Sequence, residues 1–154
     1  MLTAKEIMTV PVITVKPEMT IEQLAKLFSE HDISGAPVLD AEDRLIGMVT
    51  ENDLIRKEKK LHIPTVVTLF DAVIYLERSK PFEDELRSLA ATQVSDIYTQ
   101  NPITIEENTP LDEIAALMVE KEIHHLPVVR GKKLVGIVGK KDIIHAIARG
   151  EAGL

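Results

Sequence analysis

The chain has 154 residues, 45% of them hydrophobic and 28% charged, and a formal net charge of −7. This composition is typical of a globular protein, and the acidic balance disfavours nucleic-acid or anionic-membrane binding, which depends on clustered Lys and Arg. The lack of Cys excludes disulfides, thiol nucleophiles and thiolate metal sites. The first residues lack the pattern of a secretory signal, so we expect a cytoplasmic protein.

The first third of the chain predicts the order β-α-β-β-α. Apolar residues Ile21, Leu24 and Phe28 recur at helical spacing, and Thr20 is suited to cap that helix. A closing helix starts near Asp53. The predicted strands are 12–15, 36–39 and 45–49, with a turn at 40–43.

The same order returns after an insert. We expect repeats at 1–56 and 94–154, separated by a helical insert at 57–93. The second repeat has a helix from Leu111 with Pro110 in its first turn. Its predicted strands are 103–105, 126–129 and 134–138, and its closing helix runs from near Asp142 to Gly150.

The insert carries two apolar helical stripes. They consist of Val66, Leu69, Phe70, Val73 and Ile74, then Phe82, Leu86 and Leu89. Such a stripe packs on the chain's own core or covers a second subunit or another protein. We favour the interface, because the repeated unit reads as complete without the insert.

The two repeats match residue by residue at an almost constant offset. Matching pairs include Thr9 with Thr99, Thr14 with Thr104, Ile33 with Ile123, Pro37 with Pro127, Gly47 with Gly136 and Asp53 with Asp142. Two copies of one unit predict an α/β fold of tandem β-α-β-β-α repeats related by a pseudo-twofold axis. Sites in such a protein come in related pairs.

The strongest chemical motif is Thr50-Glu51-Asn52-Asp53, at the point where a strand passes into a helix. Free N–H groups and the dipole at a helix start favour a phosphate, and the Asp53 carboxylate can accept hydrogen bonds from ribose hydroxyls. The alternative is a simple capping box, with Thr50 at the N-cap and Asp53 three residues later.

The second copy of this motif has Gly139 in place of Thr50, and it keeps Asp142. Lys140 and Lys141 add positive charge, which serves either a polyphosphate or a solvated helix start. Nearby His124 and His125 are neighbours on an extended segment, so they would point to opposite faces and not chelate one metal ion. A phosphate contact and a surface pair both remain open for them. No pattern of catalytic residues stands out.

The segments 33–38 and 47–54, with their copies at 123–128 and 136–143, resemble a cystathionine-β-synthase (CBS) domain pair. The resemblance covers about two thirds of the chain and leaves out the insert. It implies a regulatory module, not an enzyme, that binds an adenine nucleotide (AMP, ADP or ATP) in the cleft between two repeats. It also implies a homodimer and leaves room for a protein partner at the insert. Alternatives are a sensor of S-adenosylmethionine or a cyclic dinucleotide, and a structural adaptor with vestigial sites.

The resemblance also implies which residues bind the ligand, each cleft drawing on both repeats. For the first site these are Met48, Thr50, Asp53, Thr99, Thr104, Ile123, His124 and His125. For the second site they are Thr9, Thr14, Ile33, Ser34, Ile137, Gly139, Lys140 and Asp142. Backbone near Thr14 and Thr104 would read the adenine edge, and Ile33 and Ile123 would pack on its face. The preference of Thr for strands explains the type of these residues but not their recurrence.

Overall fold

A computed structural model describes residues 2–59 and 92–150 of the chain. Contacts between Cα atoms divide the chain into two compact units. Unit 1 comprises Met1–Thr14, Leu39–Gly47 and Gln100–Leu154, and unit 2 comprises Val15–Val38 and Met48–Thr99. Unit 1 therefore combines most of the second predicted repeat with segments 1–14 and 39–47 of the first, and unit 2 combines the rest of the first repeat with the leading segment of the second. The repeat boundaries predicted above are sequence segments and stay a prediction.

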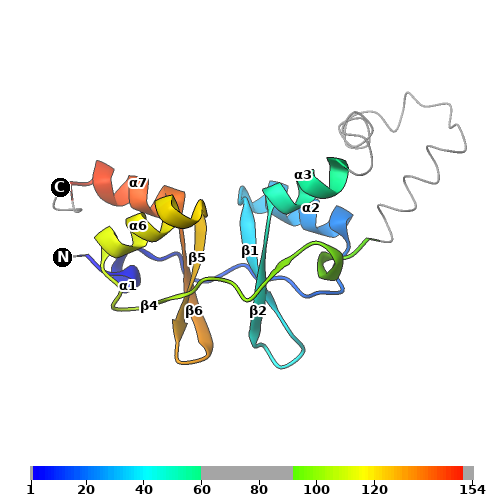
Figure 1. Cartoon of the computed structure of the whole chain (residues 1–154), viewed down its shortest axis with the longest axis horizontal. Coiled ribbons are helices and arrows are strands. Elements are labelled where there is room, and N and C mark those ends of the chain that lie inside the picture. The colour runs from blue at the N-terminus through cyan, green and yellow to red at the C-terminus, as the bar shows by residue number, and fades with distance from the viewer. Residues whose placement is uncertain (1, 60–91, 151–154) are drawn as a thin grey trace, which may run out of the picture. The chain divides into compact units, whose positions relative to one another are not determined.

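The three-stranded sheet β1-β2-β3 lies mostly in unit 2, and its residues Leu39, Leu45–Gly47 and Gln100 are grouped with unit 1. The elements of this sheet and its helices are α2 (Ile21–His31), β1 (Gly35–Leu39), β2 (Leu45–Thr50), α3 (Glu51–Lys59), a 3₁₀ turn η1 (Val94–Asp96) and β3 (Thr99–Gln100). Helices α2 and α3 lie on one face of this sheet (Figure 1). The first helix starts where expected, because the Thr20 hydroxyl accepts a hydrogen bond from the Gln23 N–H at 3.1 Å.

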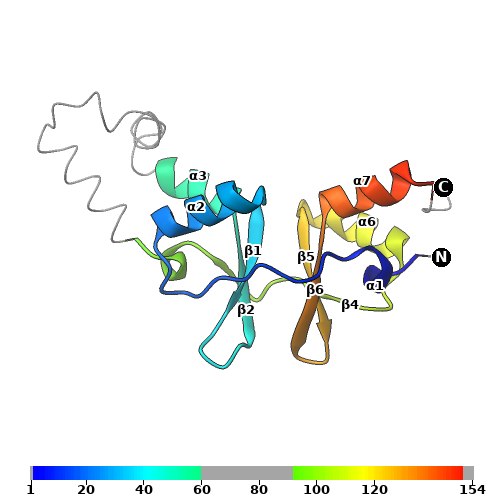
Figure 2. The same ribbon diagram turned by 180° about the vertical axis from the view of Figure 1, so that it is seen from behind.

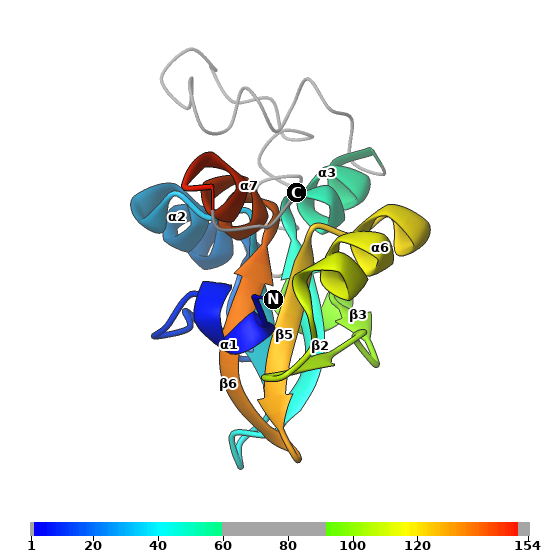
Figure 3. The same ribbon diagram turned by 90° about the vertical axis from the view of Figure 1, so that its left-hand side faces the viewer.

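Unit 1 repeats this design with the sheet β4-β5-β6. Its elements are α1 (Ala4–Ile7), β4 (Ile105–Glu106), α6 (Leu111–Lys121), β5 (His125–Arg130), β6 (Lys133–Gly139) and α7 (Lys140–Ala148). Strand β5 pairs in parallel with β4 and antiparallel with β6. The three helices lie on one face of the sheet, and α1 contacts both β6 and α7 (Figures 2 and 3).

Apolar side chains between the helices and the sheet form the core of unit 1. Leu126 and Val128 from β5, Val138 from β6 and Ile114 from α6 are fully buried. Burying each of them stabilises the fold by about 1.5–3 kcal/mol. The α1 helix adds Ala4 and Ile7 to the same cluster, so the N-terminal segment is part of this core.

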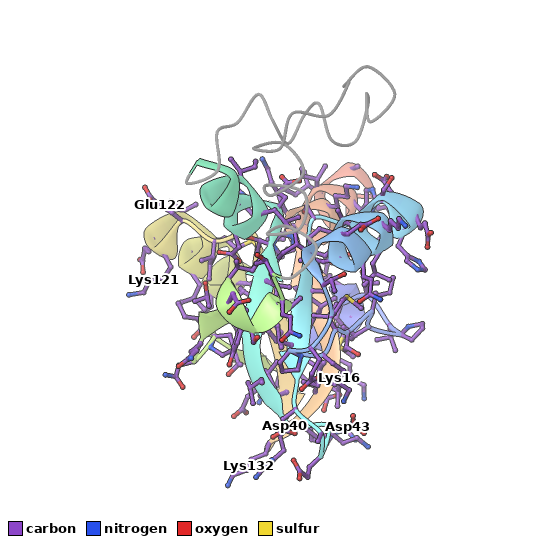
Figure 4. All side chains as sticks on the ribbon, turned by 90° about the vertical axis from the view of Figure 1, so that its right-hand side faces the viewer. Lys16, Asp40, Asp43, Lys121, Glu122 and Lys132 are labelled. Carbon is purple, nitrogen blue, oxygen red and sulfur yellow. The ribbon has the colours of Figure 1, made fainter. Side chains whose placement is uncertain are left out.

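Charged contacts hold the hairpin tips. The Arg44 guanidinium donates to Asp40 at 2.8 Å, and the Asp40 carboxylate also accepts the N–H groups of Glu42 and Arg44. Figure 4 shows Asp40 and Asp43 together at the tip of the β1–β2 hairpin. Strand β2 leads from this tip to Thr50, so the network lies at the far end of the strand from the predicted motif.

In unit 1, Arg130 at the end of β5 donates two hydrogen bonds to Glu107, at 2.6 and 3.0 Å. These bonds hold the pKa of Glu107 below its usual range. The contact ties the end of β5 to the loop that follows β4.

The α/β fold class with tandem repeats is confirmed, as are the two closing helices and the hairpins. Three details differ. The strand expected at 12–15 is reduced to a single bridge between Val15 and Val38, and β4 begins only at Ile105. Pro110 lies at the N-cap of α6, one residue before the helix.

Short helical turns at Ala4–Ile7 and Val94–Asp96 were not predicted, because they are stabilised by packing and local caps and not by a long apolar period. The predicted insert stripes fall on residues 60–91, outside the described residues.

Candidate ligand-binding sites

Each unit places an aspartate in the first turn of a helix that directly follows a strand. Asp53 is the third residue of α3 after β2, and Asp142 is the third residue of α7 after β6. A helix start presents N–H groups and the positive end of the helix dipole. We name the two places the Asp53 site and the Asp142 site.

In the Asp142 site, both carboxylate oxygens are engaged. Oδ2 accepts the Gly139 N–H at 2.7 Å, and Oδ1 accepts the Thr9 hydroxyl at 2.9 Å. Thr9 is held in place by its backbone, whose N–H donates to the Ile137 carbonyl at 2.8 Å and whose carbonyl accepts the Ile137 N–H at 3.3 Å. The structure thus brings together two predicted site residues that are 133 positions apart in the sequence.

In the Asp53 site the carboxylate also accepts the N–H of the residue that precedes the helix, which is Thr50 in place of Gly139. Asp53 Oδ2 accepts the Thr50 N–H at 2.8 Å and the Thr50 hydroxyl at 3.3 Å. Asp53 and Met48 are both buried, with 8% and 7% of their surface exposed. Thr99 opens β3, the neighbour of β2 in the sheet. The carboxylate is therefore positioned by its own helix start and kept largely from water.

The capping alternative is present at both sites, since each carboxylate accepts the N–H of the N-cap residue. A charge-assisted bond of this kind fixes the side chain that makes it. The two carboxylate oxygens together can accept about four hydrogen bonds, and the structure shows two at Asp142, one from the N-cap and one from Thr9. Capping and ligand binding are therefore compatible roles for these two residues.

Two of the other predicted residues, Ser34 and His124, directly precede β1 and β5 and lie beside the two helix starts. The Ser34 carbonyl accepts the Glu51 N–H at 2.9 Å, and the His124 carbonyl accepts the Lys140 N–H at 3.1 Å. Each of these two residues therefore lies next to the aspartate of its own unit. Ile33 and Ile123 precede them and are half-buried, as is Thr14, whereas Thr104 is exposed. The predicted approach of these residues to the aspartate of the other repeat stays a prediction.

The adjacent histidines differ in their surroundings. His124 is exposed, whereas His125 opens β5, stands opposite Gly139 in the ladder and is half-buried. Burial, with a smaller contribution from the charge of His124, lowers the pKa of His125 to about 4. Its ring is therefore neutral at pH 7. Within the described part of the chain, no cluster of three or more His, Asp or Glu side chains is placed to hold a metal ion.

The two sites carry opposite charge at the helix start. The first two residues of α3 are Glu51 and Asn52, and those of α7 are Lys140 and Lys141. All four are exposed. This difference was visible in the sequence. Gly35, the repeat counterpart of His125, was not among the predicted site residues, although the constant offset between the repeats identifies it.

Comparison with known proteins gives one consistent family. The family model of the CBS domain matches residues 4–60 and 94–149. The uncharacterised protein MJ1426 of Methanocaldococcus jannaschii is 29% identical over 151 residues, which span 93% of this chain and 89% of that protein.

The solved structures that share the fold include two that were determined with a bound ligand. The CBS domain pair of MJ0100, in complex with 5′-methylthioadenosine and S-adenosyl-L-methionine, has a TM-score of 0.71 and 25% identity, covering 97% of this chain and 98% of that one. CBSX2 in complex with AMP has a TM-score of 0.73 and 23% identity, covering 98% and 99%. CBSX2 is also the name of a chloroplastic protein of Arabidopsis thaliana. No helix in the described ranges 2–59 and 92–150 is long and apolar enough to cross a membrane.

Proposed function

Because the chain belongs to the CBS domain family, we propose that it is a regulatory module that binds AMP, ADP or ATP at the Asp53 and Asp142 sites. The observation that carries this proposal is the pair of carboxylates, each held at a helix start beside a strand end. Such a carboxylate accepts hydrogen bonds from a ribose diol, while the first turn of the helix attracts a phosphate.

The two sites should not be equivalent. Thr50 offers a hydroxyl to a phosphate, whereas Gly139 offers none. Lys140 and Lys141 add positive charge to the Asp142 site. The corresponding helix start of the Asp53 site carries the negative charge of Glu51. The Asp53 site accordingly prefers a monophosphate or diphosphate, and the Asp142 site is weaker or prefers a longer phosphate chain.

Regulation follows from a shift of population. A ligand that contacts one geometry of the module better than another stabilises the geometry it prefers by the difference in binding free energy. The module works as a cytoplasmic homodimer without catalytic activity of its own. The apolar stripes of the insert at 57–93 hold the second subunit or a regulated protein.

Two other functions remain in competition. The relative MJ0100 is described in complex with S-adenosyl-L-methionine, which favours that ligand or another adenosyl compound such as a cyclic dinucleotide. A structural adaptor would use the same fold with vestigial sites, its carboxylates serving only as caps.

A thermal-shift panel separates these functions. Purified chain is heated with AMP, ADP, ATP, S-adenosylmethionine or cyclic di-AMP, and binding to the folded state adds about 2.7 kcal/mol at a ligand concentration of 100 times Kd. A shift with the nucleotides that is lost in Asp53→Ala or Asp142→Ala supports the proposal. A shift with S-adenosylmethionine alone favours the alternative ligand. If no compound shifts the melting temperature, the structural adaptor with vestigial sites is the function that remains.

A further inference from the structure

The N-terminal segment of the chain reaches the Asp142 carboxylate directly. The Thr9 hydroxyl donates to Asp142 Oδ1 at 2.9 Å, and this bond joins residues that are 133 positions apart. At the Asp53 site the hydroxyl that reaches the aspartate belongs to Thr50, the residue just before the helix. Gly139 stands just before α7 and has no hydroxyl. The hydroxyl contact to Asp142 therefore comes from a segment far away in the sequence.

Two bonds together set the plane of the Asp142 carboxylate. The last torsion of an aspartate side chain is broad, so one hydrogen bond to one oxygen leaves the orientation of the group loosely defined. The Gly139 N–H holds Oδ2 at 2.7 Å, and the Thr9 hydroxyl holds Oδ1 at 2.9 Å. The carboxylate keeps further acceptor positions on both oxygens while these bonds are in place. A ribose diol that bonds to both oxygens depends on this orientation.

Thr9 is itself fixed by the backbone of β6. Its N–H donates to the Ile137 carbonyl at 2.8 Å, and its carbonyl accepts the Ile137 N–H at 3.3 Å. The preceding residue, Met8, lies so close to the same strand that a Cβ added at Gly136 would be 2.8 Å from the Met8 Cγ. Thr9 is exposed, so water could also accept its hydroxyl. Its backbone pairing is what directs the hydroxyl to the aspartate.

The rest of segment 2–9 is anchored on the same unit. Ala4 and Ile7 from α1 are buried in the core of unit 1. The Ala4 N–H donates to the Thr109 carbonyl at 2.9 Å. Docking of the whole segment therefore brings the Thr9 hydroxyl to its acceptor.

We propose that Thr9 is the positioning residue of the Asp142 site: it orients the carboxylate toward a ribose diol, and through it the docking of segment 2–9 and the binding of a nucleotide strengthen each other. The proposal rests on the proposed function, since it requires a nucleotide at Asp142. It changes the role of Thr9 from a contact of the ligand, as the family resemblance implied, to a contact of the aspartate. Because linkage is reciprocal, the factor by which the docked segment raises ligand affinity is also the factor by which the ligand stabilises docking.

The test is titration calorimetry with AMP and 2′-deoxy-AMP in a chain that carries Asp53→Ala, which leaves Asp142 as the nucleotide site. The readout is the ratio of AMP affinity to 2′-deoxy-AMP affinity, because this ratio reports the contact with the 2′-hydroxyl. Thr9→Val removes the hydroxyl and keeps a β-branched side chain. It should lower the ratio by about two- to tenfold, the range for one hydrogen bond, and Thr9→Ser should restore the ratio.

Thr20→Val is the matched control. The Thr20 hydroxyl caps α2 in unit 2, so the same substitution there removes a cap away from Asp142. It should lower the melting temperature and leave the ratio unchanged. A loss of stability alone is thereby distinguished from a loss of carboxylate orientation.

Hydrogen exchange measures the same linkage from the side of the segment. Saturating AMP should slow exchange of the Thr9 N–H by about the factor that Thr9→Val costs in AMP affinity, because this N–H exchanges when the segment opens. In the Thr9→Val chain, AMP should no longer slow exchange at this position.

The outcomes separate the two proposals. If the Asp53→Ala chain binds neither nucleotide, the proposed function fails at the Asp142 site and the positioning role fails with it. If that chain binds both nucleotides equally, or if Thr9→Val keeps its ratio or lowers both affinities by the same factor, the positioning role alone is overturned. A ratio that falls in Thr9→Val and returns in Thr9→Ser supports it.

Discussion

Lowering the pH from about 7.5 to about 5.5 should weaken the fold through His125. The pKa of this residue is about 4 in the folded chain against an ordinary value of 6.5, because partial burial removes water from its ring. Between these two pH values His125 is protonated in the unfolded chain and neutral in the folded chain. The free energy of unfolding therefore falls as the pH drops from 6.5 toward 4, and this loss is complete below 4.

The size of the effect follows from the two pKa values. At a pH of about 5.5, protonation favours the unfolded chain roughly elevenfold, or about 1.4 kcal/mol. We expect about 1 kcal/mol after allowance for the part of the ring that solvent reaches. Most Asp and Glu side chains stay ionised in this range, so histidines account for most of the change.

Urea unfolding followed by circular dichroism at both pH values measures this loss. His125→Gln should remove about 1 kcal/mol of the pH-dependent loss, whatever it does to the stability at neutral pH. His31→Gln is the matched control, since His31 is exposed on α2. An equal loss in the parent chain and in His125→Gln would refute the assignment of a depressed pKa to this ring.

Three further changes test the sites, the core and the insert. Asp53→Ala should leave the chain folded and lower nucleotide affinity at its site by about ten- to hundredfold in calorimetry, and unchanged affinity would reduce Asp53 to a cap. Gly136→Ala should lower the free energy of unfolding by about 1–3 kcal/mol through its overlap with Met8, and adding Met8→Ala should recover part of this loss if the overlap is the cause. Phe70→Ser with Ile74→Ser should give a smaller species in light scattering with nucleotide affinity kept. Early melting without a change of oligomeric state would instead place these two side chains in the chain's own core.

The leading segment of each repeat packs within the unit that contains most of the other repeat, so one repeat alone is an incomplete fold. Thr9 and Ile137 form a bridge between the N-terminal segment and the second repeat, and Ala4 and Ile7 fill the core beneath α7. On the other side, Val94 donates its N–H to the Met19 carbonyl, and β3 extends the sheet of β1 and β2. Each leading segment therefore packs on the unit that contains most of the other repeat. The first repeat expressed alone would lack β3, and the second expressed alone would keep its three strands and lose the Thr9–Ile137 bridge.

The sequence by itself determined the elements that depend on local patterns. Apolar spacing from Ile21 and the Thr20 cap located α2 within the chain, and the offset between repeats located the two aspartates at corresponding helix starts. These features are short-range, so a few neighbouring residues suffice to specify them. Because the same local patterns occur in both repeats, they also predict the tandem α/β arrangement.

Only the tertiary structure decided which distant segments meet. The family resemblance placed Thr9 and Asp142 in one site, but nothing local to Thr9 indicates that its hydroxyl bonds to Asp142, because that contact needs the N-terminal segment to pair with β6. The roles of Gly136 and Gly139 were equally hidden, since both are glycines on one strand and only their neighbours differ. Long-range pairing is set by packing of the whole core, so the side chains that surround each aspartate could not be read from the motif that contains it.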